Sequence, residues 1–279
     1  MSLINQALFV IERNLQRDLS LRGIAEVCGV SRFHLAHAFG DGTGLAVMEY
    51  VRRRRLTESA YALAAGARDI MEVALDYNYG SHEAFTRAFK AEFDRTPDEV
   101  RRTESVAGLA LLDAIRFVGA GSAKLETPRF ERAGELKFIG LPEPFSYGET
   151  AHIPRQWRRF MADFYGRIEH KSQTIPVGIV TSSNDGDGDL CYTCAVEVSR
   201  FDTTPVGLGT LTVKPASYAV FPHNRHITEL SQTYTAIWND WLPASGRKPA
   251  EAPSFERPNP TFDTRSGEGG VTLWIPLLQ

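Results

Sequence analysis

The chain has 279 residues and a formal net charge of −3, so its length allows two domains and its charge is neither strongly basic nor strongly acidic. No apolar run approaches the roughly 18 residues that a membrane-spanning helix needs, and the first residues lack the pattern of a signal peptide. These features argue against a membrane or secreted protein, and we expect a cytoplasmic location without membrane contact.

A short pattern occurs twice in the first hundred residues, in copies about 50 residues apart. Each copy has a short apolar helix, a break at Gly29 or Asn78, and a second helix that opens at Ser31 or Ser81. Serine is a strong N-cap because its hydroxyl accepts a bond from a backbone N–H that has no partner within the helix. This order is typical of the helix-turn-helix motif, whose second helix enters the major groove of DNA.

The second helix of each copy has an apolar face, which includes Phe39 or Phe89 and which we expect to be buried. The opposite face is expected to be exposed at its N-terminal end, where a recognition helix meets base edges. The candidate DNA contacts on this face are Arg32, Phe33, Ala36 and His37 in the first copy and His82, Glu83, Thr86 and Arg87 in the second. Arg can pair with guanine, Thr can contact a thymine methyl, and Glu can accept a bond from cytosine. Two ordinary helical hairpins with solvated faces are the alternative, which the matched pair of motifs disfavours.

A segment without Gly or Pro, residues 45–65, separates the two copies. It predicts a helix of about 20 residues, roughly 30 Å long, close to the spacing of about 34 Å between successive major-groove faces. Candidate phosphate contacts on this helix are Arg52, Arg53, Arg54 and Arg55, although some of the four must face solvent. Residues 1–110 hold 14 Lys and Arg against 15 Asp and Glu, so DNA binding would depend on local geometry rather than on overall charge.

Residues from about 5 to 103 resemble the DNA-binding domain of AraC/XylS-type bacterial transcription regulators. The resemblance rests on Gly29-Val-Ser31, Thr43-Gly44, the second copy through Phe85–Phe89, and Phe93–Pro97, which leads into a helix capped by Thr96 and Glu99. It implies that one protomer inserts both recognition helices into adjacent major grooves of double-stranded operator or promoter DNA, with RNA polymerase as a further partner. His37, His82 and Glu83 differ from the residues of many relatives, so the target sequence stays open.

From about residue 125 the pattern changes to strands and two amphipathic helices. Strands are expected near 136–141, 176–181, 190–198, 208–213, 218–221, 255–262 and 271–276, with another possible around Tyr147, and helices are expected at 153–168 and 227–241. The second half of this region repeats the order of the first, which predicts a duplicated α+β unit with two helices beside one antiparallel sheet. We therefore expect a multidomain protein: an all-α double helix-turn-helix domain (1–106), a linker (107–124) and an α+β domain (125–279).

All four Trp residues lie in this second region. Their rings could fill a core, or they could line a cleft where the two halves meet. Glu197 and Glu256, flanked by apolar strand residues, could select a cation against such rings. The candidate ligand-binding residues are Tyr147, Trp157, Tyr192, Glu197, Tyr218, Phe221 and Trp274.

Residues 153–160, 218–223, 233–246 and 271–276 resemble segments of the GyrI-like effector-binding domain, which is found fused to AraC-type readers. The resemblance implies a duplicated domain with a central cleft for small, often hydrophobic or cationic molecules. Relatives often carry Glu where Thr272 stands, which leaves Glu197 as the preferred anionic group.

These observations predict a sequence-specific transcriptional regulator, controlled by a small hydrophobic or cationic aromatic effector, and the resemblance implies a multidrug or stress response. We expect no enzyme activity and no catalytic residue, because no set of nucleophile, base and orienting residue is visible in the sequence, and we expect no cofactor. We also expect no metal site, because Cys191 and Cys194 lack a second pair and would point to opposite sides of a strand. One alternative is a hydrolase of small electrophiles that uses Glu197 with Tyr192 or Tyr147. Another is a C-terminal protein-docking module without a ligand. The operator, the ligand, the direction of regulation and the oligomeric state stay open.

Overall fold

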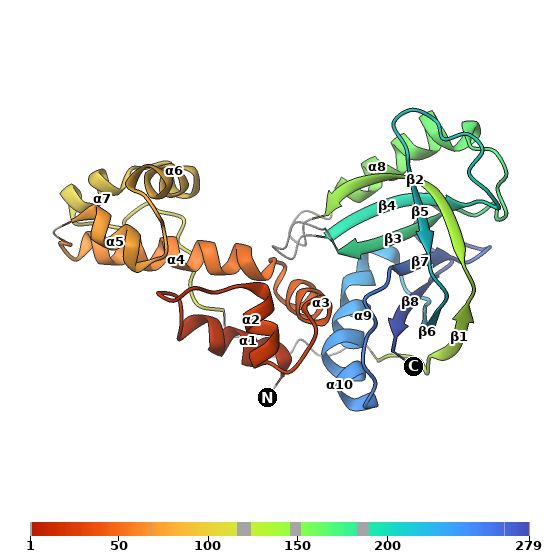
Figure 1. Cartoon of the computed structure of the whole chain (residues 1–279), viewed down its shortest axis with the longest axis horizontal. Coiled ribbons are helices and arrows are strands. Elements are labelled where there is room, and N and C mark those ends of the chain that lie inside the picture. Colours follow the sequence, from red (N-terminus) through yellow and green to blue (C-terminus); the bar gives the residue numbers. More distant parts are fainter. Residues whose placement is uncertain are drawn as a thin grey trace.

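The computed structural model describes residues 2–67, 69–115, 124–145, 152–182, 190–264 and 266–278. Helices make up the described chain from Leu3 to Thr103, and a sheet with flanking helices follows from Arg129 onward (Figure 1). This order agrees with the predicted all-α reader followed by an α+β domain.

The N-terminal part contains two helix-turn-helix motifs in the predicted register. Its helices are α1 (Leu3–Glu12), α2 (Leu21–Val27), α3 (Arg32–Thr43), α4 (Val47–Ala64), α5 (Ile70–Asp76), α6 (His82–Phe93) and α7 (Pro97–Thr103). The side chains of Ser31 and Ser81 each accept a hydrogen bond, at 3.1 Å, from the backbone N–H three residues later. Thr96 and Glu99 form the expected capping box at the start of α7. We call α3 and α6, the second helices of the two motifs, the reading helices.

Helix α4 joins two separate hydrophobic cores. Its first half packs with α1, α2 and α3 through Tyr50 and Val51, and its second half packs with α5 and α6 through Leu56 and Leu63. Its 18 residues give a length of about 27 Å, close to the predicted value. The reading helices are thus held near opposite ends of one connector (Figure 1).

The C-terminal part is built on an eight-stranded antiparallel sheet, which the described residues form in the order β1-β6-β8-β7-β3-β4-β2-β5. Its strands are β1 (Arg129–Ala133), β2 (Leu136–Phe145), β3 (Val177–Ser182), β4 (Leu190–Glu197), β5 (Gly209–Val213), β6 (Ala216–His223), β7 (Ser254–Pro258) and β8 (Val271–Leu277), and its helices are α8 (Ile153–Arg159), α9 (Leu230–Ala236) and α10 (Leu242–Ser245). The two long predicted helices are each interrupted: α8 and α9 both continue into a π-helical turn, Phe160–Phe164 and Ile237–Trp241 respectively. Both helices pack on the same face of the sheet, here called the helix face.

The sheet contains the predicted duplication. In sheet order and connectivity, β2, α8, β3 and β4 correspond to β6, α9, β7 and β8. The first strand of each half pairs with the other half of the sheet. Strand β1, which begins the first half, pairs with β6, and β5, which begins the second half, pairs with β2. Strands β3 and β7 meet in the middle, where Gly178 pairs with Glu256. This pair therefore lies at the centre of the duplication.

Three strands differ from the expectation. Strand β1 was not predicted, β7 ends at Pro258 rather than near residue 262, and β2 continues to Phe145 through Pro142 and Pro144. Strand β5 pairs with β2 only as far as Gly140, and beyond that point no other described strand pairs with that side of β2. A proline, which has no amide donor, is tolerated in a strand at such an unpaired side.

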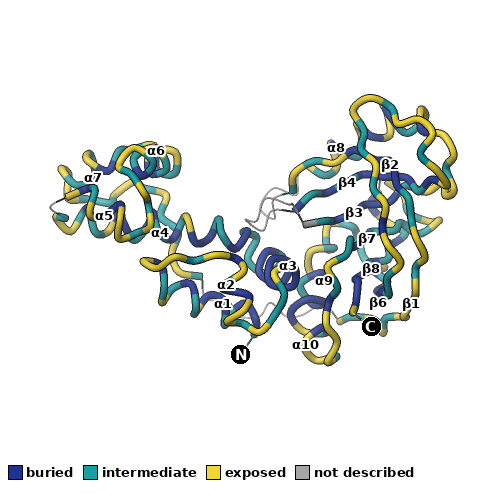
Figure 2. The backbone as a smooth tube through the Cα atoms, in the orientation of Figure 1, coloured by how far each residue is buried: buried dark blue, intermediate teal, exposed yellow. Residues whose placement is uncertain are grey.

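One hydrophobic core crosses from the N-terminal part to the C-terminal part. It contains Phe33 and Leu35 of α3 together with Trp238 and Ile275. Helix α3 is buried from residue 33 to residue 40, and it lies beside α9 (Figures 1 and 2). Among the described helices, none is long and apolar enough to cross a membrane.

Candidate functional site

The second reading helix, α6, presents its predicted strip to solvent. His82, Glu83 and Arg87 are exposed, and Thr86 is partly buried. Hydrogen bonds to its own backbone N–H and to Ser81 lower the pKa of Glu83, which keeps this carboxylate ionised and able to accept bonds. Helix α6 lies far from the C-terminal part (Figure 1), so its strip is open to DNA.

The first reading helix, α3, presents only Arg32 of its predicted strip. The expectation that the whole strip is exposed is wrong in this arrangement, because Phe33, Ala36 and His37 are 4%, 5% and 2% exposed. The indole ring of Trp238, on the π-helical turn after α9, stacks on the His37 imidazole with a centroid separation of 4.6 Å. The same indole meets the Phe33 ring edge-on at 5.6 Å. The C-terminal part therefore covers the residues with which α3 would read DNA.

Three polar contacts hold α3 against α9 and its π-helical turn. A ring nitrogen of His34 lies 3.2 Å from the backbone oxygen of Trp238. The amide of Asn239 donates to the Ala38 carbonyl at 3.1 Å, and the Thr235 hydroxyl donates to the Asp41 carbonyl at 2.8 Å. Asp41 lies among the last residues of α3, whose carbonyls lack a partner within the helix, and the Thr235 hydroxyl supplies one.

Burial changes the titration of the histidines at this contact. It lowers the pKa of His37 to about 3, with a further contribution from His34, whose own pKa burial also lowers. Both rings are therefore neutral near pH 7, which allows His37 to stack on an apolar indole without a charge to solvate.

The arginines of α4 hold the N-terminal part together more than they face DNA. Arg54 is 5% exposed, and its guanidinium contacts the carboxylates of Glu12 and Glu58 and the Leu112 carbonyl. Arg53 pairs with a carboxylate on α6, and Arg55 donates to two backbone carbonyls in the loop after α1. Arg52 is exposed. The sequence could not separate these roles because four consecutive positions point around the whole circumference of a helix.

A carboxylate with two tyrosine partners lies on the helix face at the centre of the duplication. The Tyr192 hydroxyl donates to Glu256 Oε2 at 2.6 Å, and the Tyr234 hydroxyl donates to Glu256 Oε1 at 3.0 Å. The Trp157 indole N–H donates to the Tyr192 oxygen at 3.2 Å. Burial raises the pKa of Glu256, although the two tyrosines oppose that shift. Within the described residues Glu256 forms no ion pair, so its charge has no cationic partner there.

Gly178 makes room for this cluster. A Cβ atom at Gly178 would collide with the Tyr192 hydroxyl and would lie 2.9 Å from Glu256 Oε2. Gly178 and Glu256 occupy corresponding positions of the two halves and pair with each other across β3 and β7. A glycine in one half therefore leaves space for the single carboxylate of the other half.

The predicted ligand residues do not come together in one place. Trp157 and Tyr192 meet on the helix face, whereas Tyr218 and Trp274 belong to the core on the opposite face. Glu197, the preferred anionic group, also lies on that opposite face, where Arg257 pairs with its carboxylate at 3.3 Å. Alternate residues of a strand point to opposite faces of the sheet, and strand pairing decides which residues of different strands share a face.

The opposite face already contains a cation. The Arg257 guanidinium lies 5.1 Å from the centroid of the Trp274 ring while it pairs with Glu197. The sequence predicts that an aromatic ring and a carboxylate hold a cationic ligand. On this face the cation is Arg257, a side chain of the protein itself. Phe221 packs edge-on against Trp241 in the core beneath α9, and Tyr147 lies outside the described residues.

Sequence reasoning noticed Glu256 but did not select it, and it did not include Tyr234 or Gly178. The available signal was the duplication itself. Trp157 and Tyr234 each precede the start of a π-helical turn by three residues, and both reach the central cluster. Aligning the two halves would have brought out Tyr234 as the counterpart of Trp157.

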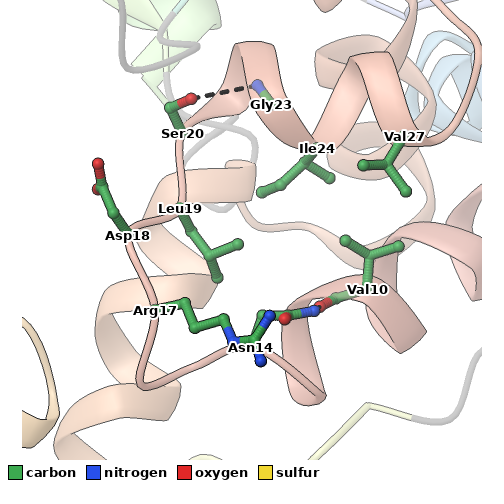
Figure 3. Close-up of a pocket in the computed structure, with 9 residues that line it drawn as sticks. All are labelled: Val10, Asn14, Arg17, Asp18, Leu19, Ser20, Gly23, Ile24 and Val27. Carbon is green, nitrogen blue, oxygen red and sulfur yellow. Dashed lines mark hydrogen bonds between the residues drawn. The ribbon is translucent and has the colours of Figure 1, made fainter.

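A separate groove lies on the N-terminal part between α1 and α2 (Figure 3). Its volume is about 240 Å³, and it is lined by Val10, Asn14, Arg17, Asp18, Leu19, Ser20, Gly23, Ile24 and Val27. Pockets for small molecules usually measure about 300–1,000 Å³, and none of the predicted site residues line this groove. No group of side chains suited to a metal ion occurs in the part of the chain that the structure describes.

Known proteins resemble both parts of the chain. Residues 24–103 match a family model described as a helix-turn-helix domain, and residues 126–278 match the GyrI-like small molecule binding domain. The transcriptional regulator Rob of Salmonella typhimurium is 26% identical over 286 residues, which cover 99% of this chain and 96% of Rob. The regulatory protein SoxS of the same species is 35% identical over 91 residues, which cover 33% of this chain and 85% of SoxS. A solved structure of SAV2435 bound to tetraphenylphosphonium aligns with 54% of this chain and 93% of its own, at 18% identity and a TM-score of 0.44.

The GyrI-like match extends over more than half of the chain, and the helix-turn-helix match precedes it. Rob, which aligns with nearly the whole chain, is a transcriptional regulator. The chain belongs to the GyrI-like small-molecule-binding family, and with its AraC-type reader it is a DNA-binding transcriptional regulator.

Proposed function

We propose that this protein binds a specific DNA sequence through α3 and α6, and that an aromatic cation bound at Glu256 controls this binding. The observation that carries the ligand proposal is the Glu256 carboxylate itself. It is held by two tyrosine hydroxyls and has no cationic partner among the described residues.

The chemistry of the cluster favours a positively charged aromatic ligand. The hydroxyl protons of Tyr192 and Tyr234 are already donated to Glu256, so the cluster offers negative charge rather than free donors. The rings of Trp157 and the two tyrosines supply faces that attract a cation. A poorly solvated carboxylate gains more from a cation than an exposed one does, because the local dielectric is lower.

The two alternative functions have less support. The proposed hydrolase would need Glu197 and Tyr192 at one substrate, but these side chains lie on opposite faces of the sheet. The Tyr192 hydroxyl, which would have to serve as the donor, already donates its proton to Glu256. A ligand-free docking module would give no reason for a carboxylate beneath α9 that has no cationic partner among the described residues.

For the DNA side, the exposed strip of α6 supports direct base contacts by His82, Glu83 and Arg87. Arg52 and Arg32 are exposed and suited to phosphates. The strip of α3 becomes available only when α3 leaves Trp238. A contact with RNA polymerase remains part of the proposal, since an activator must reach the enzyme from its promoter site.

The ligand proposal can be tested by titration calorimetry with tetraphenylphosphonium, using tetraphenylborate as a probe of similar shape and opposite charge. We expect the full chain to bind the cation and not the anion. Glu256→Gln should weaken cation binding by about ten- to a hundredfold, as for loss of a poorly solvated charge pair. Glu197→Gln is the matched control and should bind as the wild type does. Equal binding of both probes, or a loss confined to Glu197→Gln, would refute the assignment.

A further inference from the structure

Asp41, a residue of the first reading helix, lies close enough to Glu256 of the other domain for the two charges to interact. It lies in the last turn of α3, and its backbone carbonyl accepts a hydrogen bond from Thr235 on α9 at 2.8 Å. The preceding residue of α9 is Tyr234, whose hydroxyl holds Glu256. Helices α3 and α9 lie side by side at this point (Figure 1).

The Asp41 side chain has an unsatisfied buried oxygen. Its Oδ2 atom is buried and has no hydrogen-bond partner among the described residues, nor does Asp41 form an ion pair with any of them. A buried carboxylate oxygen without a donor is strongly disfavoured, and native structures seldom keep one without a function or a bound group. This oxygen is therefore an unoccupied acceptor at the contact between the two domains.

The two carboxylates influence each other. Burial raises the pKa of Asp41 well above its usual value, and the charge of Glu256 adds to that increase. Asp41 in turn contributes to the raised pKa of Tyr234, after burial and Glu256. The negative groups of the reader and of the sensor thus share one poorly solvated region without a described cation.

We propose that Asp41 and Glu256 form one anionic site, shared by the two domains, that takes a lipophilic organic cation between them. The proposal rests on the function proposed above for Glu256 and adds the reader's own carboxylate to the site. A cation there would be attracted by both groups, whereas without it the two like charges oppose the contact between α3 and α9.

This sharing gives the ligand a defined effect on DNA binding. A cation that binds better when both carboxylates are present stabilises the arrangement in which α3 lies against α9. In that arrangement Trp238 covers Phe33 and His37, so α3 cannot read bases. The cation and DNA therefore compete, and each must weaken the other by the same factor.

The first test is cation affinity in the full chain. Tetraphenylphosphonium should bind Asp41→Asn about tenfold more weakly than the wild type, because one of two attracting charges is removed. Asp240→Asn is the matched control, since Asp240 is exposed on the neighbouring π-helical turn, and it should bind normally. If Glu256→Gln loses affinity while Asp41→Asn does not, the shared site is refuted and the ligand function stands. If neither loses affinity, both fail.

The second test can overturn the proposal with the wild type alone, even if Asp41→Asn does not fold. A duplex is selected from a random pool by the full chain, and its affinity is measured with and without saturating tetraphenylphosphonium. We expect the cation to weaken DNA binding by the wild type. In folded Asp41→Asn, the factor by which the cation lowers DNA affinity should be about tenfold smaller. A cation that leaves DNA affinity unchanged or increases it would overturn the proposal.

Discussion

Arg54 is buried against two carboxylates, whereas Arg52 on the same helix is exposed. The Arg54 guanidinium lies between Glu12 and Glu58 and also holds the carbonyl of Leu112, which fixes the segment after α7 against α4. Arg52, two positions earlier, is exposed. The same residue type therefore serves stability at one position and leaves charge for a phosphate at the other.

This difference predicts opposite effects for two alanine variants. Arg54→Ala should lower the free energy of unfolding by about 3 kcal/mol, because it leaves two partly buried carboxylates without their cation. Arg52→Ala should leave the free energy of unfolding within about 0.5 kcal/mol of the wild type. It should reduce the slope of log affinity for DNA against log salt concentration by about 1, as for the loss of one phosphate contact. Urea denaturation and DNA titrations at several salt concentrations measure the two effects. An unchanged urea midpoint for Arg54→Ala would contradict this account.

At the scale of elements, the contact between α3 and α9 is held by ring packing and by hydrogen bonds to backbone carbonyls. Its apolar centre is the stack of His37 on Trp238, which requires a neutral imidazole. Asp41 lies at the other end of the contact, with a pKa that burial shifts upward. The histidines of α3 and Asp41 therefore respond to acid in opposite directions.

The sign of the histidine effect can be worked out from its pKa. His37 has a pKa of about 3 when α3 is covered and about 6.5 when it is free. The free state thus binds more protons below about pH 6.5, and docking weakens as the pH falls through that value. Asp41, whose pKa is raised by docking, acts in the opposite direction and favours docking in acid.

Removing the carboxylate isolates the histidine response. In Asp41→Asn we expect the docking equilibrium to fall at least about tenfold between pH 7.5 and pH 5.5, because His37 gains a proton only in the free state and the lowered pKa of His34 adds to the change. Hydrogen exchange of residues 32–43, corrected for the intrinsic pH dependence of exchange, reports this equilibrium. Adding His37→Asn should reduce the response to what His34 alone supplies. Exchange that is insensitive to pH in the single variant would argue against a neutral, buried His37.

At the scale of the whole molecule, local signals predicted the elements well. Ser31 and Ser81 cap their helices as expected because capping involves only neighbouring residues. The duplicated order of strands and helices was also readable, and it emerged as one antiparallel sheet. Element ends were less certain where prolines or π-helical turns intervened, as in β2 and after α8.

The site was less predictable because it depends on contacts between distant residues. Glu197 and Glu256 have similar sequence surroundings, and strand pairing alone puts one beside Arg257 and the other beside two tyrosines. The burial of Phe33 and His37 arises from packing against Trp238, about 200 residues away. No helical periodicity carries that information.

The footprint of the protein on its selected duplex, with and without cation, tests the central claim most directly. With saturating tetraphenylphosphonium, α3 stays covered and only α6 reads DNA, so protection should span one major groove. Trp238→Ala removes the ring that covers α3, because this indole packs against the aromatic rings of Phe33, His34 and His37. That variant should protect two adjacent major grooves, about one helical turn apart, whether or not the cation is present. A two-groove footprint for the cation-saturated wild type, or a one-groove footprint for folded Trp238→Ala, would contradict the account.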